Sequence, residues 1–179
     1  MPDIYFYKYV VNLQVFFRTA HSFALVNLRP LVPGHVLVCP IRREIMRFAD
    51  LTSEEAQDYM SALQTVHKFI IHAYNADSLN IAIQDGPELG QSIPHLHTHL
   101  IPRYRTDGFG DGIYRKLEKT DLEAAFDDFH NRKMAFQSGG GFVSIPDADR
   151  HDRSAEEMAA EATKLRQQID QWQTENRGK

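Results

Sequence analysis

The sequence predicts an α+β fold in a single domain. Residues 4–41 are rich in Val, Phe, Tyr and Leu, residues 50–77 have the spacing of one long helix, and β-type segments return after that helix. Strands, then a helix, then strands again are typical of the α+β class, with a mostly antiparallel sheet. The 179 residues suit one domain with a hydrophobic core of its own.

Four β-type segments open the chain. They read IYFYKYVV, LQVFFRT, SFALVNL and HVLVCPI, at residues 4–11, 13–19, 22–28 and 35–41. The linker RPLVPGH carries the proline and glycine of a turn. We therefore predict one strand in each segment.

Residues 50–77 predict one helix. Thr52 with Glu55 three residues later forms a capping box, which marks a helix start. Apolar side chains then recur on one helical face, at Ala56, Tyr59, Leu63, Val66 and Ile70.

Two more strands are predicted after the helix, at residues 78–85 and 93–103, with the glycine-containing loop DGPELGQS between them. The second segment, IPHLHTHLIPR, carries His95, His97 and His99 at alternate positions. Alternate residues of a strand share a face, so we expect the three imidazoles to line one side of the sheet.

The C-terminal part is predicted to hold a helix over residues 119–136, a mobile loop over 137–153 and a second helix that begins at a Ser154–Glu157 capping box. The apolar stripe of the last helix favours docking on the body or on a partner subunit over a coiled-coil seam. The expected organisation is a core at 1–118, a variable and partly flexible insertion at 119–153, and a C-terminal helix at 154–179.

Composition disfavours several classes of partner. The net charge is −4, whereas proteins that coat nucleic acid or anionic membranes are usually basic. No apolar stretch approaches the ~20 residues of a membrane-spanning helix, and the first residues lack the pattern of a secretory signal. One cysteine indicates a reducing compartment. We expect a cytoplasmic protein, with nuclear or mitochondrial placement left open.

Three alternating histidines first suggest zinc. On a regular strand the backbone at His95 and His99 would lie ~13 Å apart, too far for both side chains to reach one metal easily. A zinc site that borrows another histidine stays open, and a purely structural role is disfavoured because each buried imidazole needs partners. The alternation also suits phosphoryl chemistry, in which one imidazole attacks phosphorus while its neighbours position the phosphate.

The segment HLHTHLI resembles the motif of the histidine triad (HIT) superfamily, His-φ-His-φ-His-φ-φ with φ apolar, from which only Thr98 departs. Other segments are similar to the fragile histidine triad (Fhit) branch, the diadenosine triphosphate hydrolases. They are SFALVNLRPLVPGHVLVCP, IAIQDGPELGQS, HLIPR, IYRKLEK and EEMAAEATKLR. The resemblance covers residues 4–118 and 154–169 and implies a homodimer with a five-stranded antiparallel sheet and one long helix per subunit.

The resemblance implies a catalytic role for four histidines and Gln91. His97 would become nucleotidylated, His99 would hydrogen-bond the scissile phosphate, and His95 would orient His97 through its backbone carbonyl. His35 would be a fourth histidine behind these three. Gln91 would contact the leaving-group oxygen.

The resemblance also implies a substrate-binding set. Gln84 and Gln91 would contact the phosphates, Asn27 the ribose, and three apolar residues the adenine. The full set is Lys8, Leu25, Asn27, Leu37, Cys39, Gln84, Gly90, Gln91, Ser92, Ile93, His99 and Tyr114. Arg103 and Arg105 would add positive potential for an anionic substrate.

The implied activity is hydrolysis of diadenosine triphosphate to AMP and ADP through a nucleotidyl-histidine. A divalent cation, Mg²⁺ or Mn²⁺, would be bound mainly through the substrate phosphates. Two alternatives stay open: a phosphoramidase of the Hint branch, and a nucleotide-dependent signalling module with slow turnover. No metal ligated by the protein, no nucleic acid and no membrane is expected.

Overall fold

The computed structural model describes residues 2–137 and 153–176. Five strands form one antiparallel sheet in the order β3-β4-β5-β7-β6, which confirms the predicted class and the five-stranded sheet that the resemblance implies. Their bounds are β3 Val15–Arg18, β4 Ser22–Val26, β5 Val36–Pro40, β6 Ser78–Ile83 and β7 Thr98–Arg103.

The first predicted strand is wrong as a single element. Residues 4–11 form a separate hairpin of two short strands, β1 Tyr5–Phe6 and β2 Tyr9–Val10. Tyr7 stands between them with φ +57°, in the left-handed region that extended chain does not enter. The hairpin therefore turns back on itself instead of joining the sheet.

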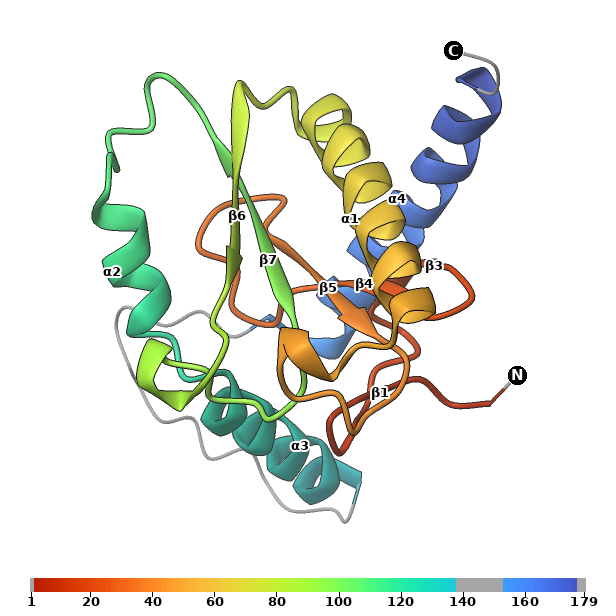
Figure 1. The fold of residues 1–179 in the computed structure, drawn as a ribbon. Coiled ribbons are helices and arrows are strands. Elements are labelled where there is room, and N and C mark those ends of the chain that lie inside the picture. The colour runs from red at the N-terminus through yellow and green to blue at the C-terminus, as the bar shows by residue number, and fades with distance from the viewer. Residues whose placement is uncertain (1, 138–152, 177–179) are drawn as a thin grey trace.

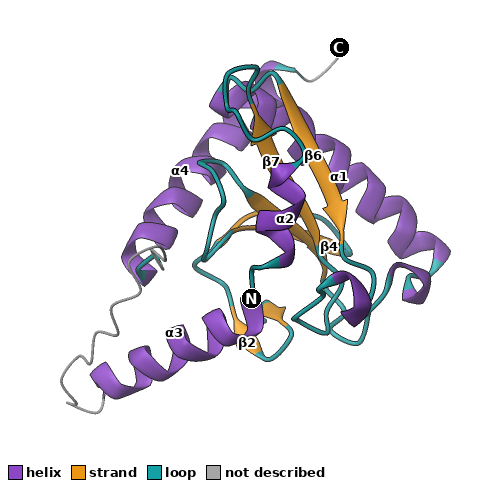
Figure 2. Cartoon of the chain, turned by 90° about the vertical axis from the view of Figure 1, so that its left-hand side faces the viewer, coloured by secondary structure: helices purple, strands orange, loops and turns teal. Residues whose placement is uncertain are grey.

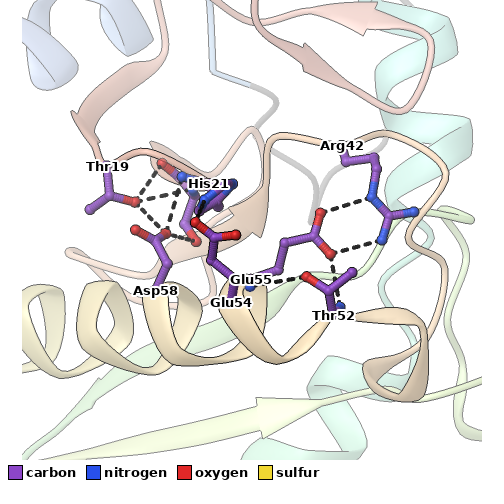
Figure 3. Close-up of polar contacts among 8 residues, drawn as sticks. Thr19, His21, Arg42, Thr52, Glu54, Glu55 and Asp58 are labelled. Carbon is purple, nitrogen blue, oxygen red and sulfur yellow. Dashed lines mark hydrogen bonds and ion pairs between the residues drawn. The ribbon is translucent and has the colours of Figure 1, made fainter.

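The long helix α1, Ser53–Tyr74, begins at the predicted capping box. Thr52 Oγ1 accepts from the backbone N–H of Glu55, and the Glu55 carboxylate accepts from the N–H of Thr52. Figure 3 shows the Glu55 carboxylate also receiving two hydrogen bonds from Arg42, both 2.8 Å long. This bidentate pair ties the start of α1 to the loop after β5.

One turn of α1 further on, Asp58 holds the β3–β4 turn. Its Oδ2 accepts from the hydroxyls of Thr19 and Ser22 at 2.6 and 2.7 Å and from the backbone N–H of His21 (Figure 3). The start of the helix is thus anchored to two neighbouring parts of the sheet.

Helices cover both faces of the sheet (Figures 1 and 2). On one side lie α1 and α4, Ala155–Glu175, which begins at the predicted Ser154–Glu157 capping box and packs against β3 and β4. Its predicted stripe is buried at Met158, Ala162, Leu165 and Ile169. The helix docks on the body of its own subunit.

On the other side lie α2, Gly112–Glu118, and the start of α3, Leu122–Gln137. Ile113 and Leu117 of α2 pack against Ile101 and Ala82 of the sheet. The α3 helix agrees with the helix predicted over 119–136, whereas most of the predicted loop at 137–153 lies outside the described residues. Short 3₁₀ helices occupy Phe48–Asp50 and Pro87–Leu89. No helix in the described ranges is both long and apolar enough to cross a membrane.

Thr98, the departure from the apolar motif, faces α1. Its hydroxyl lies 2.7 Å from the hydroxyl of Tyr59, which donates to the carbonyl of Val38. Both side chains are buried, so the Thr98 hydroxyl is satisfied within the core. The next residue, His99, therefore points to the opposite face of the sheet, under α2 and α3.

Candidate active site

The three histidines do not share a strand. Strand β7 begins at Thr98, so only His99 belongs to it, and His95 and His97 lie in the irregular segment before it. The prediction of a strand over 93–103 is wrong in its first half, and the ~13 Å spacing that argued against zinc does not apply. The arrangement of the imidazoles is set by their individual hydrogen bonds.

His97 presents a bare nitrogen. Its Nδ1 lies 2.7 Å from the backbone carbonyl oxygen of His95. A carbonyl only accepts, so Nδ1 carries the proton and Nε2 keeps its lone pair. This is the contact that the predicted orienting role of the His95 carbonyl requires. It leaves the lone pair of His97 Nε2 free to act as a nucleophile.

His99 presents the opposite tautomer. The backbone N–H of Leu31 donates to His35 Nδ1 at 3.1 Å, so His35 carries its proton on Nε2. That nitrogen lies 3.0 Å from His99 Nδ1 and donates to it. His99 must then carry its own proton on Nε2, which makes this atom a hydrogen-bond donor.

His95 is fixed at both nitrogens. The backbone N–H of Tyr7 donates to Nδ1 at 2.9 Å, and Nε2 lies 2.9 Å from the carbonyl oxygen of Pro40. The left-handed conformation of Tyr7 belongs to the turn that delivers this N–H. Because His95 is immobilised, the carbonyl that orients His97 is immobilised as well.

Burial keeps all four imidazoles neutral. Desolvation lowers the pKa of His35 to about 3, with a smaller contribution from the charge of Arg153. Desolvation also lowers the pKa of His95 to about 4, that of His97 below its usual value, and that of His99 well below it. Neutral rings are what the tautomers above require.

The two free nitrogens belong to neighbouring rings. The rings of His97 and His99 are 5.0 Å apart between centroids, and both Nε2 atoms are buried without a hydrogen-bond partner among the described residues. A buried polar atom without a partner is costly and indicates a ligand. One lone pair and one N–H donor on neighbouring rings suit a phosphate, whose phosphorus the first can attack and whose oxygen the second can bind.

The residues predicted to contact phosphate make hydrogen bonds within the protein. Gly90 has φ +82°, and a Cβ there would come within 2.9 Å of Gln84 Nε2, which donates to the carbonyl of Leu89. Gln91 Nε2 donates to the carbonyl of Met46 at 2.7 Å, and Ser92 Oγ accepts from the N–H of Leu122. These bonds do not use up the donors, since an amide Nε2 carries two hydrogens and the Ser92 hydroxyl, which accepts here, still carries its own proton.

The predicted adenine-contacting residues share the face of His99. Leu25, Leu37 and His99 are register partners across β4, β5 and β7, and Cys39 lies two residues along from Leu37. All three apolar side chains, and Ile93, are fully buried. A base reaches them only if the segments that cover this face move.

Asn27 directly follows β4 and lies beside His35. Its Nδ2 lies 3.3 Å from His35 Nε2, and its Oδ1 accepts from the N–H of Arg29. Its side chain is fully buried. The structure thus brings the residue predicted for the ribose into contact with the histidines.

Four other predicted residues lie in protein contacts at the periphery. Lys8 pairs with Asp127 at 2.9 Å and with Glu123, both on α3. The Tyr114 hydroxyl accepts from Asn80 on β6, and Arg103 pairs with Asp107 at 2.7 Å. Arg105 is 90% exposed and lies 3.9 Å from Asp77.

Sequence reasoning missed three contributors to the site. Phe6 lies edge-on to His97, with ring centroids 5.4 Å apart, and also contacts His95. The N–H of Tyr7 and the guanidinium of Arg153 are the others. No motif marks them: Phe6 and Tyr7 fell inside a predicted strand, and Arg153 fell in the segment without an assigned role.

No group of three or more His, Cys, Asp and Glu within residues 2–137 and 153–176 is arranged to hold a metal ion.

Comparisons with known proteins match this geometry. The family model described as HIT domain matches residues 9–106. A bis(5'-adenosyl)-triphosphatase of Saccharomyces cerevisiae is 41% identical, over 98% of this chain and 96% of its own length. A bis(5'-nucleosyl)-tetraphosphatase (asymmetrical) of Schizosaccharomyces pombe is 40% identical, over 93% of this chain and 94% of its own. The crystal structure of the C. elegans NitFhit protein superposes with a TM-score of 0.64 at 28% identity, over 93% of this chain and 30% of that one.

Proposed function

The chain belongs to the HIT domain family, and we propose that it hydrolyses dinucleoside polyphosphates, diadenosine triphosphate among them, to a nucleoside monophosphate and the remaining nucleotide. One observation carries the proposal: the neighbouring rings of His97 and His99 each hold a buried Nε2 that has no hydrogen-bond partner among the described residues, the first with a lone pair and the second with a proton. The 41% identity to a bis(5'-adenosyl)-triphosphatase over nearly the whole length supports the substrate class.

In the first step, the lone pair of His97 Nε2 attacks the α-phosphorus of the substrate. An N–P bond forms, the P–O bond to the β-phosphate breaks, and ADP leaves with the bonding pair. The imidazole becomes cationic, and the His95 carbonyl 2.7 Å from Nδ1 stabilises that charge. His99 Nε2–H donates to a non-bridging oxygen of the same phosphate, where negative charge builds up.

In the second step, water attacks the phosphorus, the N–P bond breaks and AMP is released. The pair of electrons returns to Nε2, which restores the tautomer held by the His95 carbonyl. The sum is diadenosine triphosphate and water to AMP and ADP. Splitting one displacement into two is the general advantage of a covalent intermediate.

The rest of the proposed site follows from the residues around the histidines. We assign the phosphates to Gln84, Gln91 and the loop Gly90–Ile93, and the ribose to Asn27. Leu25, Leu37 and Cys39 would meet the base once the covering segments open, and Lys8 and Tyr114 would lie at the margin. Mg²⁺ or Mn²⁺, bound through the substrate phosphates, would neutralise part of their charge.

We also propose a homodimer and a cytoplasmic location. The homodimer is supported by an open sheet edge at β6, where Ile81 is 50% exposed. The cytoplasmic location is supported by the presence of one cysteine in the sequence, Cys39, which is buried as a free thiol.

The test is hydrolysis of diadenosine triphosphate and tetraphosphate with Mg²⁺, with the products resolved. The wild type should release AMP together with ADP or ATP, and His97→Ala should lose on the order of 10⁴-fold or more in kcat because the covalent step is gone. His72→Ala, at an exposed position of α1, is the matched control and should keep full activity.

A short incubation with substrate labelled at the α-phosphate should place label on wild-type protein and none on His97→Ala. An inert wild type, or a His97→Ala variant within tenfold of it, would overturn the proposal. The ratio of the hydrolysis rates for diadenosine triphosphate and tetraphosphate shows which number of phosphates the enzyme prefers.

A further inference from the structure

A cation from the far end of the chain lies behind the histidines. Arg153, the residue before the cap of α4, donates from Nε to the backbone carbonyl of Asn27 at 3.0 Å, and its Nη2 donates to the same oxygen. Its backbone N–H donates to the carbonyl of Leu28. The two residues so held are 126 and 125 positions earlier in the chain, at the point where it leaves β4.

The same guanidinium is itself fixed from α4. Arg153 Nη1 donates to the Glu161 carboxylate, whose other oxygen accepts from the hydroxyl of Tyr74 at 2.8 Å. The ring of Tyr74 packs directly on Gly34, next to His35. The side chains of Arg153 and Glu161 are both only 20% exposed, so the pair is partly withdrawn from water.

The loop that Arg153 holds is the loop that holds His35. Asn27 Oδ1 accepts from the N–H of Arg29, and the N–H of Leu31 donates to His35 Nδ1. The first bond holds the loop, and the second sets the tautomer of His35 and, through it, the tautomer of His99. An anchor on the Asn27 carbonyl therefore acts on the donor atom of His99 without touching the substrate.

The positive charge of Arg153 acts on His35 in addition to its contacts with the loop. His35 lies against His99, Asn27 and the Leu31 N–H, and His97 lies beyond His99. Arg153 supplies a fixed positive charge that acts on His35, and Glu161 and Tyr74 lie behind it. A protonated His35 would offer a donor to the Leu31 N–H, and that hydrogen bond would be lost. A nearby guanidinium opposes this protonation.

We propose that Arg153 is a positioning residue of the active site. It holds the Asn27–His35 loop and so preserves the hydrogen bonds from the Leu31 N–H through His35 to His99, which keep a proton on His99 Nε2 for the substrate phosphate. The inference rests on the proposed function for its catalytic consequence. The effect of Arg153 on the histidine tautomers does not depend on a bound substrate. It assigns a role to a residue at the end of the segment 119–153, which no sequence motif explained.

The experiment separates position from charge. Arg153→Met removes both the contacts that hold the loop and the positive charge. It should lower kcat at least tenfold and shift the acidic limb of the plot of kcat/KM against pH up by about one pH unit. Arg153→Lys keeps the charge but loses the forked contact, so it should lower kcat and leave the limb in place. Glu161→Gln removes the opposing negative charge and should move the limb slightly to lower pH.

Histidine ¹⁵N NMR gives a readout that needs no activity. In Arg153→Met, the His35 and His99 resonances should begin to titrate at higher pH than in the wild type, and in Glu161→Gln they should not. If Arg153→Met does not fold, Arg153→Lys and Glu161→Gln still separate the effect of the contacts from the effect of the charge.

A purely structural role predicts lower thermal stability in all three variants with identical pH profiles and unchanged ¹⁵N titrations, and that result would overturn the inference. If the wild type does not hydrolyse dinucleoside polyphosphates, the proposed function fails, and the NMR titrations still decide whether Arg153 governs the histidines.

Discussion

At the residue scale, the chemistry of the site depends on which nitrogen of each imidazole carries its proton. The His95 carbonyl gives His97 a free lone pair, and the Leu31 N–H, acting through His35, gives His99 a free donor. The same residue type thus has two opposite functions 5.0 Å apart. Backbone groups make the difference, because a carbonyl only accepts and an amide N–H only donates.

Gly34 is a second place where one atom decides the structure. Its φ is +83°, and a Cβ would lie 2.8 Å from the ring of Tyr74. Gly34→Ala should destabilise the fold by about 3 kcal/mol, roughly 1 from the left-handed backbone and the rest from displacing a partly buried ring.

Gly108→Ala is the matched control, with φ +70° and open space around the added Cβ. It should cost only the backbone part, about 1 kcal/mol. Urea unfolding measures both variants, and equal losses would show that the contact with Tyr74 contributes nothing. Because Gly34 adjoins His35, Gly34→Ala should also lower the hydrolytic rate.

At the scale of elements, the site is assembled at one end of the sheet by segments from the whole chain. The β1–β2 hairpin supplies an N–H to His95, the loop after β4 holds His35, and β7 supplies His99. On top lie α2 and the start of α3, where the Leu122 N–H donates to Ser92 and Glu118 approaches Gly90. His97 is only 2% exposed beneath this cover, so substrate must displace part of it.

The β6 edge carries a prediction about assembly. Ile81 is 50% exposed and pairs with Leu100, which places its side chain on the α1 side of the sheet, and Met60 of α1 is 53% exposed. If two subunits join edge to edge at β6, as we propose, Ile81→Lys with Met60→Lys should turn the dimer into a monomer of 20.6 kDa.

Sedimentation or light scattering measures this directly. Leu13→Lys is the control, an apolar residue that is 66% exposed and lies outside β6 and α1. It should leave the mass unchanged. A monomeric wild type, or a dimer that survives both lysines, contradicts the proposed interface.

At the scale of the whole molecule, four neutral buried histidines make stability depend on pH. The pKa of His35 falls to about 3 and that of His95 to about 4, both through desolvation, whereas in the unfolded chain each titrates near 6.5. Between these values the unfolded state binds more protons than the folded state. Stability is therefore complete above about pH 6.5 and is lost as the pH falls towards 4.

At pH 5 the loss should be on the order of 2 kcal/mol for each histidine that stays neutral, relative to pH 8. Urea midpoints between pH 8 and 5 measure it. In this window Glu55 contributes nothing, because its hydrogen bonds with Arg42 lower its pKa to about 2 and the unfolded carboxylate titrates only near 4.5. A midpoint that stays level from pH 7 to 5 would show that the histidines take up protons in the folded state.

Sequence reasoning succeeded where the signal was local and periodic. Both capping boxes, at Thr52 and at Ser154, lie where the pattern predicts them. The buried face of α1 includes Tyr59, Leu63, Val66 and Ile70, as predicted, because helical spacing alone selects it. Reasoning failed at residues 4–11 and 93–97, where a β-type composition belongs to a tight hairpin and an irregular segment, and composition does not encode tertiary hydrogen bonds.

By itself the sequence determined the α+β class, the three longer helices α1, α3 and α4, and the residue types that can attack and hold a phosphate, because these depend on patterns read along the chain. It did not predict the short helix α2. The tertiary structure decided which nitrogen is free on His97 and on His99, because the deciding groups are the His95 carbonyl and, acting through His35, the Leu31 N–H. It also brought Arg153 to the Asn27 carbonyl. Backbone groups are the same at every residue, so only their placement in space gives them a role, and folding is what supplies that placement.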